Sequence, residues 1–175
     1  MTENNTIATV PAKVLKELSR WCSRGARAKA LRDQESVFYL EGWLYATDSY
    51  RIARVHVGEH PELDGAVIDP ETFDRMTAKD KDAALEAGGV RLGKALIPYA
   101  TDRKPIGAAA KLFGDRRDDT FDMDFNPAFV ADLAKLASAT GSKSMGIFSD
   151  GGRMRARVLA PGDLAVDALI MPIRR

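Results

Sequence analysis

The feature that most constrains the fold is a pattern of elements that occurs at both ends of the chain. Near the N-terminus, a short strand over Ile7 to Val10 precedes a helix that begins at Pro11, and three strand segments follow. Near the C-terminus, a strand over Phe121 to Phe125 precedes a helix that begins at Asn126-Pro127, and three strand segments again follow. Two copies of strand, helix and antiparallel meander predict an α+β fold with an internal structural repeat.

The remaining elements follow from residue periodicity and turn signals. The first helix carries a buried stripe up to Trp21 and Cys22 and ends at Gly25, and the last helix ends at Gly141. A second helix begins at Pro70, whereas residues 105–113 fit either a helix or an irregular loop. Changes in composition divide the chain into a first module (1–60), a middle module (61–120) and a C-terminal module (121–175). The strands predicted between the helices are Val37–Leu40, Trp43–Ala46, Arg51–Val57, Val67–Ile68, Val90–Leu92, Ala95–Tyr99, Met145–Ser149, Met154–Leu159 and Leu164–Ile173.

Composition limits the class of protein. With 175 residues, 45% of them hydrophobic and 29% charged, the chain can bury a substantial core. Its single cysteine, Cys22, excludes an internal disulfide, and the N-terminus lacks the pattern of a secretory signal. No apolar run approaches the roughly 20 residues of a membrane-spanning helix. We therefore expect a soluble, cytoplasmic protein without a membrane partner.

The net charge is only +1, so any affinity for a polyanion must come from an uneven distribution of charge. The segment from Pro11 to Arg32 has this asymmetry, because Glu17 is its only acid. In the last helix, Lys135 adds a weaker contribution. At helical spacing the first of these cations form a basic ridge that can follow DNA phosphates, although an ordinary solvated helix face has the same composition. The basic residues of the segment are Lys13, Lys16, Arg20, Arg24, Arg27, Lys29 and Arg32.

Three segments resemble the beta subunit of bacterial DNA polymerase III, the sliding clamp. Ala46-Thr-Asp-Ser-Tyr-Arg-Ile52 is similar to the Ala-Thr-Asp-Gly-His-Arg-Leu of that family, and Leu169-Ile-Met-Pro-Ile-Arg-Arg175 to its terminal Val-Met-Pro-Met-Arg-Leu. The third, Phe125-Asn126 with Phe129 and the helix to Leu136, follows the pattern of the family's last helix. The resemblance covers residues 7–57 and 121–175 and implies parts of the family's second and third domains.

The resemblance implies a clamp fold with sheets outside and helices inside, and a pocket that receives a short linear peptide from partner proteins. Methionine and aliphatic walls adapt to several peptides, and an arginine can hold their polar groups. Judged alone, the C-terminal motif also fits a terminal core strand with a proline at its edge. Carried over residue by residue, the pocket comprises Thr47, Ser49, Tyr50, Arg51, Ile52, Leu169, Met171, Pro172, Ile173 and Arg174.

The sequence offers little support for catalysis or for a cofactor. His56, His60 and Cys22 have no metal-site spacing, and Gly88-Gly89 and Gly151-Gly152 lack the lysine of a phosphate loop. We therefore predict neither a cofactor nor a catalytic residue. A metal-dependent nucleic-acid enzyme remains the less favoured alternative, and its carboxylates would be Asp115, Asp118, Asp119, Asp122 and Asp124.

Together these patterns predict a DNA sliding clamp, that is, a homo-oligomeric ring around duplex DNA that acts as a polymerase processivity factor. Its partners would be double-stranded DNA of any sequence, further copies of itself, and a DNA polymerase and clamp loader that bind through the peptide pocket. Because the chain is shorter than the three-domain bacterial subunit, its ring would need a different number of subunits. The alternative from another class is a clamp-like adaptor that keeps the pocket without the ring.

Overall fold

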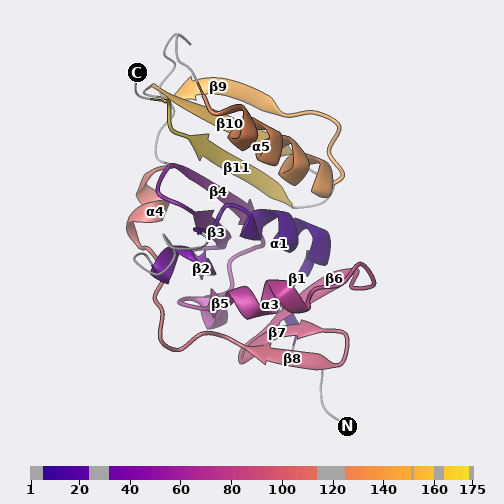
Figure 1. Cartoon of the computed structure of the whole chain (residues 1–175). Coiled ribbons are helices and arrows are strands. Elements are labelled where there is room, and N and C mark those ends of the chain that lie inside the picture. The colour runs from indigo at the N-terminus through magenta and orange to yellow at the C-terminus, as the bar shows by residue number, and fades with distance from the viewer. Residues whose placement is uncertain (1–5, 24–31, 114–124, 151, 160–163, 174–175) are drawn as a thin grey trace.

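The computed structural model describes residues 6–23, 32–113, 125–150, 152–159 and 164–173. In this part of the chain, a row of helices lies across one side of two antiparallel sheets, and a short helix packs on the other side (Figure 1). The helices are α1 (Ala12–Ser19), α3 (Pro70–Arg75), α4 (Ala108–Lys111) and α5 (Pro127–Ala139), with the short 3₁₀ turns η1 (Arg32–Gln34) and η2 (Pro61–Leu63). The strands are β1 (Thr6–Pro11), β2 (Val37–Leu40), β3 (Trp43–Thr47), β4 (Arg51–His56), β5 (Val67–Ile68), β6 (Asp82–Glu86), β7 (Gly89–Leu92), β8 (Ala95–Pro98), β9 (Gly146–Asp150), β10 (Arg153–Leu159) and β11 (Ala165–Ile170).

The strand order brings together segments from both ends of the sequence. The larger sheet has the order β5-β2-β3-β4-β11-β10-β9, and the smaller sheet has the order β1-β6-β7-β8. The central junction of the larger sheet joins β4 to β11, with Arg51 opposite Ile170 and Val55 opposite Val166. The α+β class is confirmed. The division into three modules stays a prediction, and the sheets run across its boundary near residue 60, because β1 pairs with β6.

The two longest helices begin as their sequences predict. Pro11 precedes the first turn of α1, and the Asn126 side chain accepts a hydrogen bond of 3.0 Å from the N–H of Ala128 at the start of α5. α1 ends at Ser19, earlier than predicted, and Trp21 follows in a turn with its side chain fully buried. The predicted end at Gly25 lies outside the described residues.

Apolar side chains cover both faces of the larger sheet. The main core lies between the sheets and the row formed by α1, α3 and α5, and includes Leu15, Leu18 and Leu133. A smaller cluster lies on the opposite, outer face, where α4 packs against the sheet. This second cover gives the outer face a raised wall beside the junction of β4 and β11. The cluster comprises Phe38, Tyr45, Ile52, Val67, Ala109, Phe113 and Leu169.

Two differences from the sequence prediction have physical causes, and one alternative that the sequence left open is decided. β6 was not predicted, because two of its five residues are alanines, which give only a weak strand signal, and because its partner β1 lies far away in the sequence. α4 shows that part of residues 105–113 is helical. β11 ends at Ile170 rather than at Ile173, because Pro172 cannot donate a ladder hydrogen bond. The strand predicted over Phe121 to Phe125 lies outside the described residues except for Phe125, which is in no strand.

Candidate functional site

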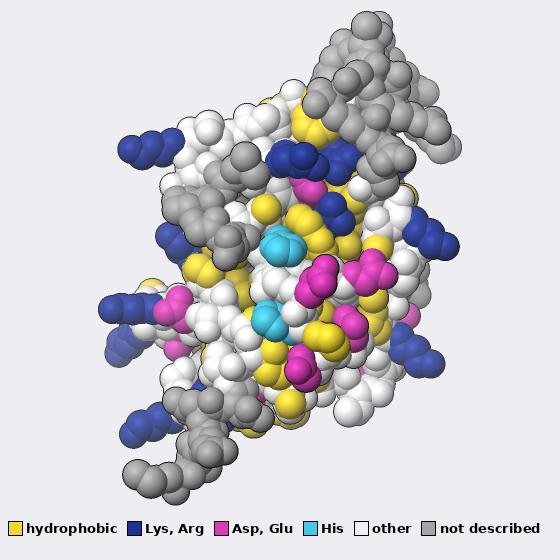
Figure 2. All heavy atoms as spheres, turned by 180° about the vertical axis from the view of Figure 1, so that it is seen from behind, with side chains coloured by type: hydrophobic (Ala, Val, Ile, Leu, Met, Phe, Trp, Pro, Cys, Tyr) yellow, Lys and Arg dark blue, Asp and Glu magenta, His cyan; other side chains and the backbone are white. Residues whose placement is uncertain are grey.

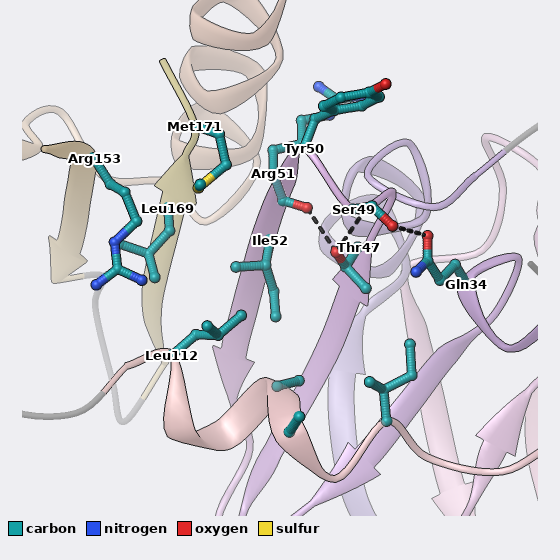
Figure 3. Close-up of a pocket in the computed structure, with 13 residues that line it drawn as sticks. Gln34, Thr47, Ser49, Tyr50, Arg51, Ile52, Leu112, Arg153, Leu169 and Met171 are labelled. Carbon is teal, nitrogen blue, oxygen red and sulfur yellow. Dashed lines mark hydrogen bonds between the residues drawn. The ribbon is translucent and has the colours of Figure 1, made fainter. Parts of the chain in front are cut away.

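The turn between β3 and β4 is held by its own side chains (Figure 3). The hydroxyl of Thr47 donates to the carbonyl of Arg51 at 2.8 Å and accepts from the N–H of Ser49 at 3.2 Å. The carboxylate of Asp48 accepts from the N–H groups of Tyr50 and Arg51, both at 3.1 Å. Ser49, which stands where the clamp pattern has glycine, adopts a positive φ of 74°. The Ala-Thr-Asp motif therefore builds a specific turn.

The side chain of Arg51 lies on the helix face of the sheet. Its guanidinium donates to Asp132 of α5 at 2.8 Å, to Asp48 at 3.2 Å and to the carbonyl of Arg20 at 2.9 Å. It also lies over the rings of Trp21 and Phe129, with its central carbon 4.9 and 4.5 Å from their centroids. The side chain of Arg51 thus joins β4 to α1 and α5, and its guanidinium forms hydrogen bonds with other residues of the protein.

A pocket opens on the outer face where β4 and β11 meet. Its volume is about 330 Å³. The turn after β3 forms one side, α4 with Ile106 and Leu112 on either side of it forms another, and β4, β10 and β11 complete it (Figure 3). The lining residues are Gln34, Thr47, Ser49, Tyr50, Arg51, Ile52, Ile106, Ala108, Ala109, Leu112, Arg153, Leu169 and Met171.

The pocket has a fixed apolar floor and an exposed apolar rim. Ile52 and Leu169 lie opposite each other across β4 and β11 and are only 4% and 2% exposed. Tyr50, Met171 and Leu112 are 50%, 45% and 44% exposed at the rim. An apolar ligand group would rest on a packed floor while the rim side chains adapt to its shape.

Most of the predicted pocket residues meet in this cavity. Those that line it are Thr47, Ser49, Tyr50, Arg51, Ile52, Leu169 and Met171. Pro172 and Ile173 are not among the lining residues, and Arg174 lies outside the described residues. The sequence interpretation missed the wall around α4, although Ile106, Ala109 and Leu112 recur at every third position, as the apolar face of a short helix would. It also missed Gln34 and Arg153, for which no local sequence signal exists.

The predicted basic ridge is only partly described. Lys13, Lys16 and Arg20 are exposed. The ammonium of Lys16 donates to the carbonyl of Met76 at 3.1 Å, and Arg20 pairs with Glu17 at 3.2 Å. Arg24, Arg27 and Lys29 lie outside the described residues. On α1 and α5, Lys13 and Lys135 line one surface hollow between the two helices.

Charge differs between the two faces of the molecule. Figure 2 shows the face opposite the helices, where acidic side chains gather beside the two histidines. The charges of Glu59 and Asp64 act on Tyr39, whose hydroxyl accepts a hydrogen bond of 2.7 Å from the N–H of His60. A polyanion would therefore be favoured at the helix face over this region of the outer face.

The described residues contain no group of three or more histidine, cysteine, aspartate or glutamate side chains placed to hold a metal. The acidic cluster from Asp115 to Asp124 lies outside them. No helix in the described ranges is both long enough and apolar enough to cross a membrane.

The fold has counterparts among solved structures. It superposes on the DNA polymerase sliding clamp of Pseudomonas aeruginosa with a TM-score of 0.59 and 12% identity, covering 95% of this chain and 66% of that one. It superposes on the DNA polymerase III beta subunit of Thermotoga maritima with a TM-score of 0.54 and 10% identity, covering 96% of this chain and 64% of that one. This chain has the fold of a DNA sliding clamp. It spans slightly less than two thirds of the length of these sliding clamps.

No protein-family model matches the chain, and no curated protein matches its sequence. The sliding-clamp fold is therefore carried by backbone arrangement, while 10% and 12% identity leave few shared side chains. The short motifs around Thr47 and Leu169 are where the resemblance in sequence and the pocket in the structure coincide.

Proposed function

We propose that this chain is a DNA sliding clamp, a processivity factor that forms a homo-oligomeric ring around duplex DNA and receives partner proteins in the pocket between β4 and β11. The mechanism is topological and requires no bond-making or bond-breaking step. The partners are a DNA polymerase and a clamp loader, each bound through a short linear peptide.

One observation carries this proposal. The two segments that resemble clamp motifs, around Ile52 and around Leu169, are more than half the chain apart in sequence, yet they pair in the sheet and form the floor of one apolar pocket. If the C-terminal motif were only a terminal core strand, nothing would require the N-terminal motif to lie beside it. The pairing supports a shared role for the two motifs in binding.

The pocket suits one or two apolar side chains of an extended peptide. A volume of about 330 Å³ is at the lower end of the range for ligand pockets. The exposed rim of Tyr50, Met171 and Leu112 supplies soft, adaptable walls, which suit several peptides of similar character. Arg153 at the margin places a cation close to polar groups of the bound peptide.

The helix face supports the DNA part of the proposal. Lys13 and Lys135 lie at the same hollow between α1 and α5. Lys16 on α1 and Arg20 at the end of α1 are also exposed. Lysine and arginine contacts to phosphates carry no base information, as a protein that moves along any sequence requires. The acidic region on the opposite face would turn the helices toward DNA.

Peptide binding tests the proposal directly. Fluorescence anisotropy of a labelled clamp-binding peptide with the full chain should show saturable binding. Met171→Asp and Leu112→Asp, at the rim, should each weaken this binding by about tenfold or more. Ile147→Asp changes a side chain of similar exposure, 47%, on β9 away from the pocket, and should bind as the native chain does. Equal binding by all four proteins would contradict the pocket assignment.

The adaptor alternative is compatible with the same pocket, because residues of one copy of the chain are enough to line it. The pocket therefore needs no ring. Light scattering over a range of concentrations separates the two functions. A stable closed oligomer supports the clamp, whereas a monomer that still binds the peptide supports the adaptor.

A further inference from the structure

The described chain contains three meanders that follow a helix, and two of them are joined through their last strands. β2-β3-β4 follows α1, β6-β7-β8 follows α3, and β9-β10-β11 follows α5. The last strands β4 and β11 pair antiparallel, and α1 and α5 contact each other on one face of the sheet thus formed. The last strand of the remaining meander, β8 of β6-β7-β8, pairs with β7 and has no described strand on its other edge (Figure 1).

The pairing of β4 with β11 shows what a last strand offers at its edge. The N–H of Met171 donates to the carbonyl of Tyr50 at 3.0 Å. In an antiparallel pair, such bonded positions alternate along the strands, so Ile52 and Leu169 also exchange their peptide hydrogen bonds. Their side chains lie in the outer cluster. At this junction, the residues that exchange peptide hydrogen bonds are therefore those whose side chains lie on the outer face of the sheet, away from the helices.

The open edge of β8 has the same arrangement. The N–H of Ala12 donates to the carbonyl of Lys81 at 2.9 Å, which marks a hydrogen-bonded position between β1 and β6. Hydrogen-bonded positions alternate along each strand. When this alternation is followed through the registers of β6, β7 and β8, the peptide N–H and C=O of Ile97 point toward β7. Those of Leu96 then point away from the sheet. Ile97 is 3% exposed in the main core, so Leu96 faces outward, where its side chain is 45% exposed.

The other open edge, β9, has the opposite arrangement. When the alternation of hydrogen-bonded positions is followed from Met171 through β11 and β10, the peptide groups of Phe148 point toward β10 and those of Ile147 point to the open edge. Ile147 lies opposite Ala156, which belongs to the main core, so its side chain points to the helix face. Antiparallel pairing of β8 with β9 would therefore place the helices of the two copies on opposite faces of the sheet.

We propose that β8 pairs antiparallel with β8 of a second copy, about a twofold axis at Leu96. The two Leu96 residues exchange their peptide hydrogen bonds, and their side chains pack together on the outer face. Pro98, whose peptide group also points outward, has no N–H, so the contact is centred on Leu96. This arrangement repeats the β4–β11 junction and keeps the helices on one face. It rests on the proposed self-association and specifies it, because a twofold contact requires an even number of copies.

A cysteine crosslink tests the geometry. Opposed residues of a bonded antiparallel pair have Cα atoms about 5.5 Å apart, within the disulfide range of about 4.4–6.8 Å. Leu96→Cys should form a covalent dimer under mild oxidation. The native chain should not, because Cys22 is buried. In a mixture of Leu96→Cys with a size-tagged Ile147→Cys, the mixed dimer should be absent. Preferential formation of the mixed dimer would overturn the proposal in favour of head-to-tail pairing.

Light scattering of Leu96→Asp provides the second test, with Ile147→Asp as the matched control. Leu96→Asp should halve the mass of the native assembly, while Ile147→Asp at the other open edge should leave the β8 contact intact. A native trimer, or a mass that does not respond to Leu96→Asp, would overturn the twofold contact. Peptide binding by the same samples keeps the questions apart. A trimer that binds the peptide refutes the β8 contact only, and a β8 dimer that does not bind refutes the pocket only. A monomer that binds the peptide refutes both the β8 contact and the ring and leaves the adaptor.

Discussion

The guanidinium of Arg51 and the carboxylate of Asp132, 81 residues apart in the sequence, lie 2.8 Å from each other and tie β4 to α5. Both side chains are largely buried, at 8% and 22% exposure. Because β4 also forms the floor of the pocket through Ile52, this ion pair fixes the C-terminal unit against the strand that carries the candidate site. The arginine of the motif therefore acts on the geometry of the pocket from the opposite face of the sheet.

Replacing Asp132 with asparagine should destabilise the protein. Asparagine retains a hydrogen-bond acceptor for Arg51 but removes the charge that compensates a buried guanidinium, at a cost of about 1–3 kcal/mol. Urea unfolding followed by circular dichroism measures this change in the free energy of unfolding. The control, Asp74→Asn, removes an exposed carboxylate from α3 and should change it by less than about 0.5 kcal/mol. Equal effects of the two substitutions would contradict a structural role for the pair.

The same pair predicts how this loss depends on pH. Burial raises the pKa of Asp132, but hydrogen bonds from Arg51 and Lys135 outweigh burial and hold the pKa below its usual value. A carboxylate with a lowered folded-state pKa stabilises the protein above its unfolded pKa of about 3.9, and this contribution is lost as pH falls through the folded pKa. The stability difference between the native chain and Asp132→Asn should thus be constant near neutral pH and shrink below about pH 4. A difference that grows in acid would contradict this assignment.

Ser49→Gly should stabilise the turn beside the pocket. Ser49 adopts a φ of 74°, where a residue with a Cβ is strained by about 1–2 kcal/mol and glycine is not. The substitution also removes an exposed hydrogen bond of 2.7 Å from the Ser49 hydroxyl to Gln34, so the net gain should be about 0.5–1 kcal/mol. Ser144→Gly, at an exposed position without a positive φ, should instead be neutral or destabilising. A lower melting temperature for Ser49→Gly would show that the Gln34 contact outweighs the strain.

The elements that could be predicted from the sequence are those with strong local signals. Asn126-Pro127 begins a helix by local hydrogen bonding, and the aromatic and apolar run of β3 follows the turn at Glu41-Gly42, so both are where the sequence places them. β6 has no such signal and exists because β1 pairs with it. The smaller sheet was therefore only partly predictable, since a non-local partner decides it.

The candidate pocket was predictable in part for the same reason. Ile52 and Leu169 were expected together because short motifs resemble a known family, and pairing of β4 with β11 brings them into contact. Which face receives the Arg51 side chain was not predictable, because that depends on Asp132 and on the aromatic rings packed around the guanidinium. The wall from Ile106 to Leu112 depends on packing across the outer face, which local periodicity does not report.

Neutralising the two lysines at the α1–α5 hollow should reduce the salt dependence of DNA binding without changing the fold. Lys13→Gln with Lys135→Gln removes two charges from the helix face, and each lost phosphate contact lowers the slope of log K against log salt by about 0.9. Lys16 is left in place because its ammonium donates to the carbonyl of Met76. The Lys135 ammonium donates to Asp132 at 3.2 Å from a side chain that is 53% exposed, so losing this contact should cost little stability. The control, Lys111→Gln, removes an exposed cation from α4 on the outer face and should leave the slope unchanged. Binding to duplex DNA measured at several salt concentrations distinguishes these outcomes. A change of slope in the control half as large as in the double variant would mean that DNA responds to net charge rather than to the helix face.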